Sequence, residues 1–257
     1  MLAHCRALID ATAEACVAVK PQLARFEALG APGREALGAV AEHARAAGLL
    51  VIADGKRGDI DVTAQAYAAS LFGGLETPYG HVAGLGADIA TVNPLMGRDA
   101  LEPFVRAARE TGAGVLVLVR TSNPGAADLQ ERELADGGAV WERLAALVAE
   151  LGETAGEGVS DVGAVIGATA PERLQRAREL MPAAPFLLPG IGAQGGRVED
   201  LSAAFAPGPA GGLISASRSI AGAHLSAGGT PAAAARAEAE RLRELAWRLA
   251  ARAVGAS

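Results

Sequence analysis

Lysine is almost absent from this sequence. It occurs only at Lys20 and Lys56, and the other 21 of the 23 basic residues are arginine. Arginine replaces lysine readily in surface salt bridges, but it stays protonated and cannot serve where a site must release a proton or needs a compact charge. Both lysines come shortly after apolar runs that are typical of buried strands. We therefore expect the two side chains to point into a cleft.

Other scarcities exclude whole classes of protein. Two cysteines are too few for a disulfide framework, and the four histidines show no regular spacing to each other or to cysteine, so no metal site is predicted. No apolar run could span a bilayer and no signal peptide is recognisable, which favours a cytoplasmic protein. The net charge is −6 and the arginines are scattered, which argues against a nucleic-acid partner. No G-x-G-x-x-G follows an early strand, so no dinucleotide cofactor is indicated.

What the sequence does contain is an alternation of short apolar runs with longer helical patterns, which is typical of a parallel α/β sheet. The expected strands are Cys16–Lys20, Leu49–Ala53, Asp88–Val92, Val115–Val119, Val162–Ile166, Phe186–Leu188 and Gly212–Ser215. The expected helices include Leu2–Ala15, Arg34–Ala47, Thr63–Leu71, Ala100–Thr111, Val140–Leu151, Pro171–Met181 and a charged amphipathic helix over Pro231–Val254.

Two folds fit this alternation, a closed (β/α)8 barrel and an open doubly wound sheet. A glycine-rich loop, 189–196, follows one of the last strands, and Ser217-Arg218 follows the next. A phosphate site built from the loops after the last two strands is typical of (β/α)8 barrels, and this favours the barrel. No linker or break in composition appears, so we expect one barrel domain over residues 1–257.

The densest chemistry is the charged segment Asp54-Gly55-Lys56-Arg57-Gly58-Asp59. Side chains alternate along a strand, so Asp54 and Lys56 are expected on one face, and Asp59 can fold back after Gly58. Carboxylates beside a lysine hold it charged and in place. Such a lysine can donate a proton to a carbanion that forms next to it. The alternative is a purely structural cluster of ion pairs at the end of a barrel.

Two further segments could bind a ligand. The glycines of the loop 189–196 allow backbone N–H groups to approach an anion, Gln194 adds an amide and Arg218 a fork that matches phosphate. Ser122, in the segment 121–125, offers a hydroxyl group at the end of a strand that could read the polar edge of a planar ring. An ordinary turn with a helix cap explains the segment 121–125 equally well.

These segments together resemble orotidine 5′-phosphate decarboxylase. The sequence Asp54-Gly55-Lys56-Arg57-Gly58-Asp59-Ile60-Asp61-Val62-Thr63 is similar to the D-x-K-x-x-D-I-x-x-T signature of that family. Four further segments also resemble this family, and their residues are similar to those of its longer bacterial (type 2) subgroup. They are 19–22, 121–125, 189–196 and 217–220. The resemblance covers nearly the whole chain, although the D-x-K-x-x-D core is shared with sister decarboxylases of sugar phosphates.

The resemblance implies decarboxylation of orotidine 5′-phosphate to UMP, in pyrimidine biosynthesis, without cofactor or metal. The catalytic residues it implies are Lys56 as proton donor, Asp54 beside the departing carboxylate, and Asp59, which reaches the neighbouring subunit's site in a homodimer. The implied substrate-binding residues are Lys20 at the ribose, Ile60 and Thr63 with Asp59, Ser122 at the pyrimidine, and Pro189, Gly192, Gln194 and Arg218 around the phosphate.

The chain departs from the family pattern in places. Asp61 stands where the subgroup usually has glycine and Gly55 where it usually has alanine. The family begins with a strand that carries a ribose-contacting aspartate, and only seven strands are predicted here. We therefore expect the natural protein to begin upstream of Met1. Two other functions stay open, a non-catalytic phosphate-binding barrel and a sister, metal-dependent sugar-phosphate decarboxylase.

Overall fold

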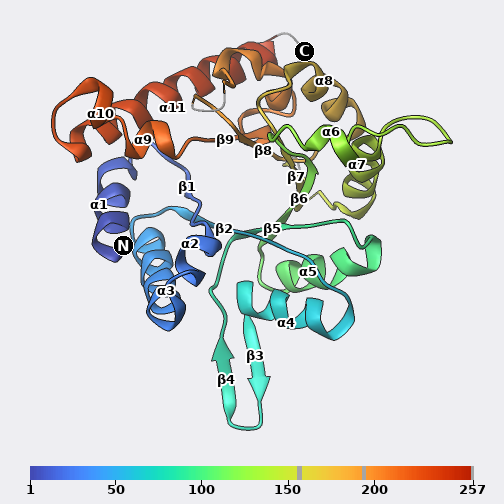
Figure 1. Cartoon of the computed structure of the whole chain (residues 1–257), viewed down its shortest axis with the longest axis horizontal. Coiled ribbons are helices and arrows are strands. Elements are labelled where there is room, and N and C mark those ends of the chain that lie inside the picture. The colour runs from blue at the N-terminus through green and yellow to red at the C-terminus, as the bar shows by residue number, and fades with distance from the viewer. Residues whose placement is uncertain (155–157, 193–194, 256–257) are drawn as a thin grey trace. The chain divides into compact units, whose positions relative to one another are not determined.

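A computed structural model of the chain describes residues 1–154, 158–192 and 195–255 (Figure 1). The strands are β1 (Ala18–Val19), β2 (Leu50–Arg57), β3 (Gly74–Thr77), β4 (Gly80–Ala83), β5 (Ile89–Val92), β6 (Gly114–Arg120), β7 (Val162–Ile166), β8 (Phe186–Pro189) and β9 (Gly212–Ser215). The α-helices are α1 (Leu2–Thr12), α2 (Leu23–Glu27), α3 (Gly30–Ala46), α4 (Asp61–Leu71), α5 (Arg98–Glu110), α6 (Ala126–Leu129), α7 (Val140–Leu151), α8 (Pro171–Leu180), α9 (Arg218–Ala221), α10 (His224–Ala227) and α11 (Pro231–Gly255). The 3₁₀ turns are η1 (Val198–Asp200), η2 (Ser202–Phe205) and η3 (Pro209–Gly211).

These elements form two compact units, one of Met1–Val115 with Ile220–Arg241 and the other of Leu116–Ser219 with Leu242–Ser257. Every run predicted as a strand contains one, although β1 is shorter than expected, and every predicted helix is present. That both units belong to a single domain over residues 1–257 stays a prediction. None of the helices within the described ranges combines the length and the apolar character needed to cross a membrane.

The first unit is built on the parallel strands β1, β2 and β5, in that order. Ala18 pairs with Leu50 across β1 and β2, and Ile52 pairs with Ile89 across β2 and β5. Helix α5 buries Ala100, Leu101, Phe104, Val105 and Ala108. This spacing of one and four residues places all five on one helix face, as packing against a core requires.

The second unit holds β6, which begins at the border of the first unit, followed in order by β7, β8 and β9. Every residue of β7 is buried, as in a parallel strand covered on both faces. Ala164 of β7 pairs with Phe186 of β8, which in turn pairs with Gly212 of β9. The parallel register brings the carboxyl ends of these strands, and the loops that follow them, to the same edge of the sheet.

A buried arginine, Arg178 of α8, forms hydrogen bonds with backbone segments that follow this helix in the second unit. The guanidinium of Arg178 lies 3.8 Å from the ring centre of Phe186. It donates hydrogen bonds to backbone carbonyls of three segments, those of Met181 and Ala184 at 2.8 Å, of Ala204 at 2.8 Å and of Gly211 at 3.1 Å. Burial lowers the pKa of Arg178 to about 10. The side chain therefore joins these backbone segments of the second unit through hydrogen bonds to their carbonyls.

The antiparallel hairpin of β3 and β4, which projects away from α4 in Figure 1, was not predicted from the sequence. Leu75 pairs with Val82 in its register, and both side chains are exposed. Tyr79, in the two-residue turn, is fully exposed. Short strands with solvent on both faces lack the apolar periodicity by which the other strands were predicted.

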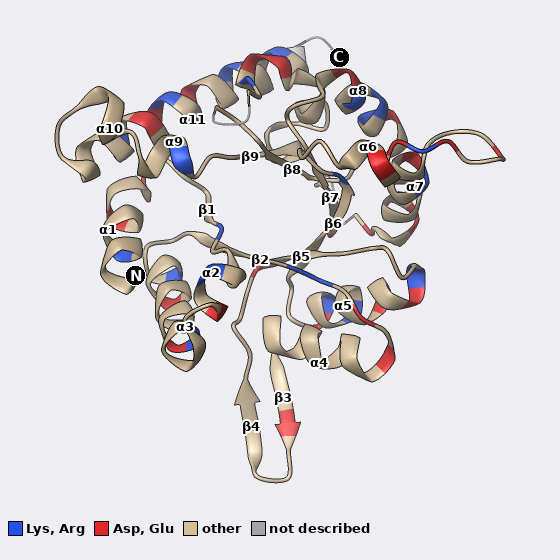
Figure 2. Cartoon of the chain, viewed as in Figure 1, with Lys and Arg blue, Asp and Glu red and all other residues tan. Residues whose placement is uncertain are grey.

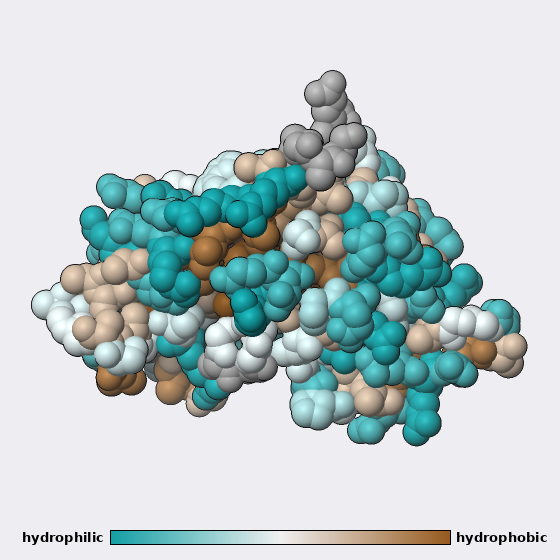
Figure 3. Space-filling model, turned by 90° about the horizontal axis from the view of Figure 1, so that it is seen from above, coloured by the Kyte–Doolittle hydropathy of each residue, from teal (hydrophilic) through white to brown (hydrophobic). Residues whose placement is uncertain are grey.

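Helix α11 has the predicted amphipathic character. It buries Ala235, Leu242 and Leu249, whereas Arg241 and Arg248 are exposed and each pairs with a glutamate of the same helix. Seen from above, the surface toward the viewer carries bands of hydrophilic side chains with hydrophobic ones between them (Figure 3). The charged residues of this helix are thus a solvated face.

Candidate active site

The predicted charged segment lies at the carboxyl end of β2, where the strand departs from regular pairing. Ala53 pairs with Ala90, but the next pair along the two strands is Arg57 with Val92. The chain therefore advances four residues on β2 against two on β5, which makes an irregular bulge of the intervening residues. Lys56 takes a left-handed backbone conformation there, with φ of 48°. Bulges of this kind redirect side chains and are frequent next to active sites.

Asp54 lies between the only two lysines of the chain. Its Oδ2 accepts a hydrogen bond from Nζ of Lys20 and its Oδ1 from Nζ of Lys56. The Asp54 side chain is 6% exposed, that of Lys20 14% and that of Lys56 47%. In Figure 2, blue segments that mark basic residues interrupt the mostly tan ribbon near β1 and β2. The half-exposed ammonium of Lys56 is thus the accessible member of the cluster.

The charge state of Asp54 follows from two opposing effects. Burial by itself would raise the pKa of Asp54, but the charges and hydrogen bonds of Lys20 and Lys56 outweigh burial, and the pKa is lowered below its ordinary value of 3.8. The carboxylate is therefore ionised throughout the physiological range. A fixed negative charge beside two ammonium groups is the central electrostatic feature of the first unit.

Among the described residues, no hydrogen bond or ion pair is seen between this cluster and Asp59, Ile60 or Thr63. The carboxylate of Asp59 accepts a hydrogen bond at 2.8 Å from the N–H of Ile60, and among the described ion pairs Lys56 binds Asp54 and not Asp59. Ile60 and Thr63 are exposed at the start of α4. Asp61 has a left-handed φ of 47°, a conformation that glycine adopts readily and that aspartate tolerates better than most residues. One carboxylate between two lysines, rather than two carboxylates around one lysine, is what the chain forms.

Arg57, which follows Lys56, is held from three sides. Its guanidinium forms an ion pair with Glu27 of α2, donates to the carbonyl of Gly55 at 3.2 Å, and lies 5.6 Å from the ring centre of Tyr67 on α4. Arg57 therefore ties the strand after the bulge to two helices. The sequence showed Arg57 only as a spacer in the motif, because its partners are 30 residues before it and ten after it.

Sequence reasoning also missed Thr91, a buried residue of β5 whose hydroxyl donates to Oδ1 of Asp54 at 3.2 Å. Threonine is common in strands for its branched side chain alone, so nothing in Ile89–Val92 marked this hydroxyl as part of a site.

In the second unit, Ser122 follows β6 and lies against the residue that follows β7. A Cβ on Gly167 would come within 2.8 Å of Cα of Ser122, so only glycine fits there without a shift. The N–H of Gly167 donates to the carbonyl of Arg120 at 2.7 Å. The backbone N–H of Thr121 donates a hydrogen bond to the side-chain oxygen of Gln130 at 2.8 Å. The segment with Ser122 is thus fixed by contacts on both sides.

The glycine-rich loop follows β8 at Pro189. Gly190 and Gly192 have φ of 106° and 70°, which side chains larger than glycine rarely adopt. The N–H of Gly192 donates to the carbonyl of Gly196, and the N–H of Gly196 donates to the carbonyl of Gly190, both at 3.0 Å. These two N–H groups therefore stabilise the conformation of the loop itself. Gln194 lies outside the described residues.

Arg218 begins α9 after β9 and is exposed. A Cβ on Gly192 would lie 3.7 Å from Cβ of Ser219, so the loop after β8 and the segment after β9 are neighbours. Arg218, the residue before Ser219, therefore belongs to a segment that neighbours the glycine loop within the second unit. The N–H donors of an exposed guanidinium beside a glycine loop suit an anion such as phosphate.

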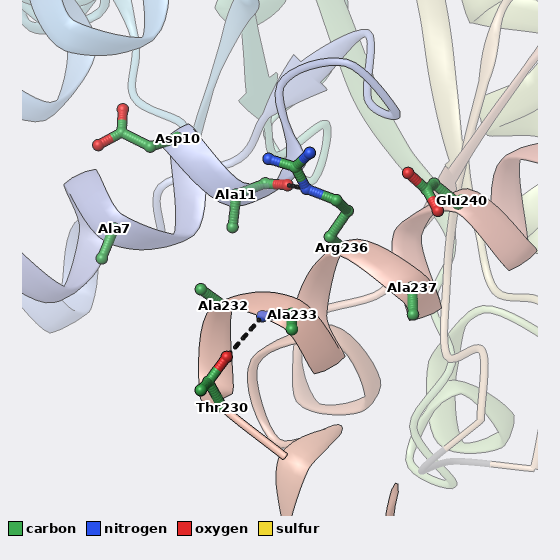
Figure 4. Close-up of a pocket in the computed structure, with 9 residues that line it drawn as sticks. All are labelled: Ala7, Asp10, Ala11, Thr230, Ala232, Ala233, Arg236, Ala237 and Glu240. Atoms are coloured by element: carbon green, nitrogen blue, oxygen red, sulfur yellow. Dashed lines mark hydrogen bonds between the residues drawn. The ribbon is translucent and has the colours of Figure 1, made fainter. Parts of the chain in front are cut away.

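A separate pocket lies between α1 and α11 in the first unit (Figure 4). Alanines of both helices line most of it, and its polar lining comes from Asp10, Thr230, Arg236 and Glu240. Arg236 turns toward α1 and donates to the carbonyl of Ala11 at 3.1 Å. None of the residues predicted as catalytic or substrate-binding lines this pocket.

Comparison with known proteins places this geometry in context. The sequence model of the family described as "Orotidine 5'-phosphate decarboxylase / HUMPS family" matches residues 2–237. The orotidine 5′-phosphate decarboxylase of Deinococcus radiodurans is 49% identical over 216 residues, which are 83% of this chain and 74% of that protein. That of Rhodopirellula baltica is 46% identical over 225 residues, which are 86% of this chain and 72% of that protein.

Solved structures agree in fold. The OMP decarboxylase of Leishmania donovani is 34% identical, with a TM-score of 0.72 over 96% of this chain and 88% of that one. A structure from Streptomyces avermitilis, also 34% identical, reaches a TM-score of 0.80 over 96% of this chain and 81% of that one. The predicted fold class, α/β of the TIM-barrel type, is confirmed. With its family model matched over most of its length and two relatives near half identity, this chain belongs to the orotidine 5′-phosphate decarboxylase family.

Proposed function

We infer that this chain catalyses the decarboxylation of orotidine 5′-phosphate to UMP in pyrimidine biosynthesis. The observation that carries the inference is the buried Asp54 carboxylate between Lys20 and Lys56 at the ends of β1 and β2. Relatives at 46% and 49% identity that are orotidine 5′-phosphate decarboxylases support it. A decarboxylation without an electron sink needs preorganised charge around the reacting carbon, and this cluster supplies such charge.

In the proposed reaction, the bond between the pyrimidine carbon and its carboxylate breaks and CO₂ leaves. The electron pair stays on the ring carbon, and Nζ of Lys56 donates a proton to it. Asp54 lies beside the departing carboxylate, so repulsion between the two anions is relieved as neutral CO₂ forms. Lys20 binds the ribose and keeps Asp54 in place. Lys56 then regains its proton from water.

We propose that residues of the second unit bind other parts of the same substrate. Ser122 contacts the pyrimidine ring, while Pro189, Gly192, Gln194 and Arg218 surround the phosphate. The exposed Arg218 and its neighbouring glycine loop support the phosphate assignment. Phosphate binding far from the reacting carbon can be used to hold the ring where charge stabilises the transition state.

We further propose a homodimer with shared active sites, in which Asp59, Ile60 and Thr63 act in the site of the partner subunit. Ile60 and Thr63 are exposed at the start of α4, and the carboxylate of Asp59 accepts a hydrogen bond from the N–H of Ile60, which supports this assignment. Val62 in the same segment is also exposed, so an apolar surface is available there for contact with a second copy. We also propose a cytoplasmic setting, which the low cysteine content of the chain supports.

Mixing two inactive variants tests the shared site. Lys56→Ala and Asp59→Asn should each be inactive alone, and subunit exchange between them should restore about one quarter of the wild-type turnover. Half of the randomly formed dimers are mixed, and each mixed dimer then has one intact site and one doubly altered site. Co-expression of differently tagged chains, followed by purification and a decarboxylation assay, gives the measurement.

A mixture of Lys56→Ala with Lys20→Ala is the matched control, because both residues come from the same subunit and no intact site can form. Restoration in the control mixture, or none in the test mixture, would contradict the shared site.

The reaction itself is tested by following the loss of orotidine 5′-phosphate absorbance with and without EDTA. We expect turnover to continue at an unchanged rate in EDTA, with UMP as product, because the proposed chemistry uses the charges of Asp54 and the lysines. Binding of UMP without turnover would instead indicate a non-catalytic phosphate-binding protein. Turnover of a sugar phosphate that stops in EDTA would indicate the sister decarboxylase.

A further inference from the structure

Thr91 of β5 lies opposite the bulge at the end of β2 and forms hydrogen bonds with two of its residues. The two regular pairs, Ala53 with Ala90 and Arg57 with Val92, enclose Thr91 on one strand and the residues from Asp54 to Lys56 on the other. Thr91 is 1% exposed. A polar group so deeply buried is retained at low cost only if it is hydrogen-bonded on both sides.

Both hydrogen-bonding capacities of the Thr91 hydroxyl are used within the bulge. It accepts a hydrogen bond from the backbone N–H of Lys56 at 2.9 Å and donates one to Oδ1 of Asp54 at 3.2 Å. The same Oδ1 receives the ammonium of Lys56. One neutral hydroxyl thus contacts the main chain of the lysine and the carboxylate that holds the lysine's side chain.

The backbone of Lys56 is the part of the cluster that most needs such support. A left-handed φ of 48° is unfavourable for a residue with a side chain and persists only when its surroundings hold it. The hydrogen bond from its N–H to Thr91 fixes this conformation. Without it, the backbone could relax and carry the ammonium away from Asp54.

We propose that Thr91 is a positioning residue for decarboxylation, which holds the backbone of Lys56 and the carboxylate of Asp54 in the geometry that presents the ammonium to the substrate. Thr91 itself does not transfer the proton. The inference rests on the proposed role of Lys56 as proton donor. It predicts that the hydroxyl, and not the methyl group or the volume of Thr91, sets the turnover rate.

Two substitutions separate these contributions. Thr91→Val keeps the shape and removes the hydroxyl, and its kcat should fall about 10- to 100-fold, the size expected for losing a hydrogen bond to a charged group. Its KM should change much less, because the phosphate and ring contacts remain. Thr91→Ser restores the hydroxyl and should recover most of the lost kcat. Thr91→Ala serves as a second hydroxyl-free variant if Thr91→Val does not fold, and the same fall in kcat is expected.

Thr12→Val is the matched control. Thr12 is also buried, in α1, and its hydroxyl donates to the carbonyl of Leu8 at 2.8 Å. The same chemical change there should leave kcat at the wild-type value. An equal fall in kcat in Thr12→Val and Thr91→Val would show a general effect on folding and overturn the proposal.

Because the chain has only two lysines, NMR of protein labelled at the lysine side chains reports on the cluster directly. Thr91→Val should shift the signal that disappears in Lys56→Ala, and Thr91→Ser should return it toward its wild-type position. An unmoved Lys56 signal in Thr91→Val overturns the positioning role. A moved signal with unchanged kcat also overturns it, and if Lys56→Ala is active as well, the fault lies in the role assigned to Lys56.

Discussion

Replacing Lys56 by alanine is expected to reduce the turnover of orotidine 5′-phosphate by about 10²- to 10⁴-fold, the range found when a positioned proton donor is removed. UMP binding should remain measurable, because the phosphate and ring contacts come from other residues. The fold should tolerate the change: the Lys56 side chain is 47% exposed, and Asp54 keeps its contacts with Lys20 and Thr91. Absorbance assays give the turnover and calorimetric titration gives UMP binding.

Lys56→Arg is the informative companion to this variant. Arginine keeps a positive charge near Asp54 but holds its proton far more tightly than lysine. If Lys56 acts by donating a proton, Lys56→Arg should be nearly as slow as Lys56→Ala. Recovery of turnover in Lys56→Arg would mean that charge alone matters, and appreciable turnover in Lys56→Ala would refute the assignment of the proton donor.

The scarcity of lysine drew attention to Lys20 and Lys56, but it did not predict that both would contact the single carboxylate of Asp54. The sequence places Asp54 two residues before Lys56 and Asp59 three residues after it, and nothing in that local pattern brings in Lys20. Lys20 reaches Asp54 because β1 pairs with β2 in parallel, a contact between residues 34 apart in the chain. Sequence periodicity reports on each strand separately, whereas the site depends on their register.

The same limit explains the bulge and the hairpin. Apolar runs such as Val162–Ile166 predicted their strands correctly because complete burial requires a continuous apolar sequence. The bulge that places Lys56 is a mismatch between β2 and β5, so neither strand reveals it alone. The exposed hairpin of Gly74–Thr77 and Gly80–Ala83 has no buried face to leave a pattern. Elements that follow from burial were predictable, and those that follow from pairing were not.

Replacing Asp54 by asparagine should affect both catalysis and stability. The amide oxygen of asparagine can accept from one ammonium, but its NH₂ group then faces the other, and the charge that opposes the substrate carboxylate is gone. We expect turnover to fall by about 10²-fold or more, as for the loss of a preorganised electrostatic group. Because Asp54 is only 6% exposed and holds two lysines, the free energy of unfolding should fall by about 3 kcal/mol.

Asp61→Asn is the matched control, because Asp61 is exposed and asparagine also tolerates its left-handed backbone. Its free energy of unfolding should stay within about 0.5 kcal/mol of the wild-type value. Equal losses in the two variants would show that Asp54 has no special electrostatic role.

The stabilising effect of Asp54 should also depend on pH in a defined direction. The pKa of Asp54 in the folded chain is lowered below the ordinary value of 3.8, so its ionised form is favoured by folding. This contribution is complete above pH 3.8 and is lost as the pH falls through the lowered pKa of the folded state. The free energy of unfolding can be measured by urea denaturation from about pH 7 to about pH 3. Near neutral pH, the difference in this free energy between wild type and Asp54→Asn should be constant. That difference should shrink only at the acidic end. A difference that stays constant into acid, or shrinks already near neutral pH, would mean that the lysines do not stabilise the ionised carboxylate.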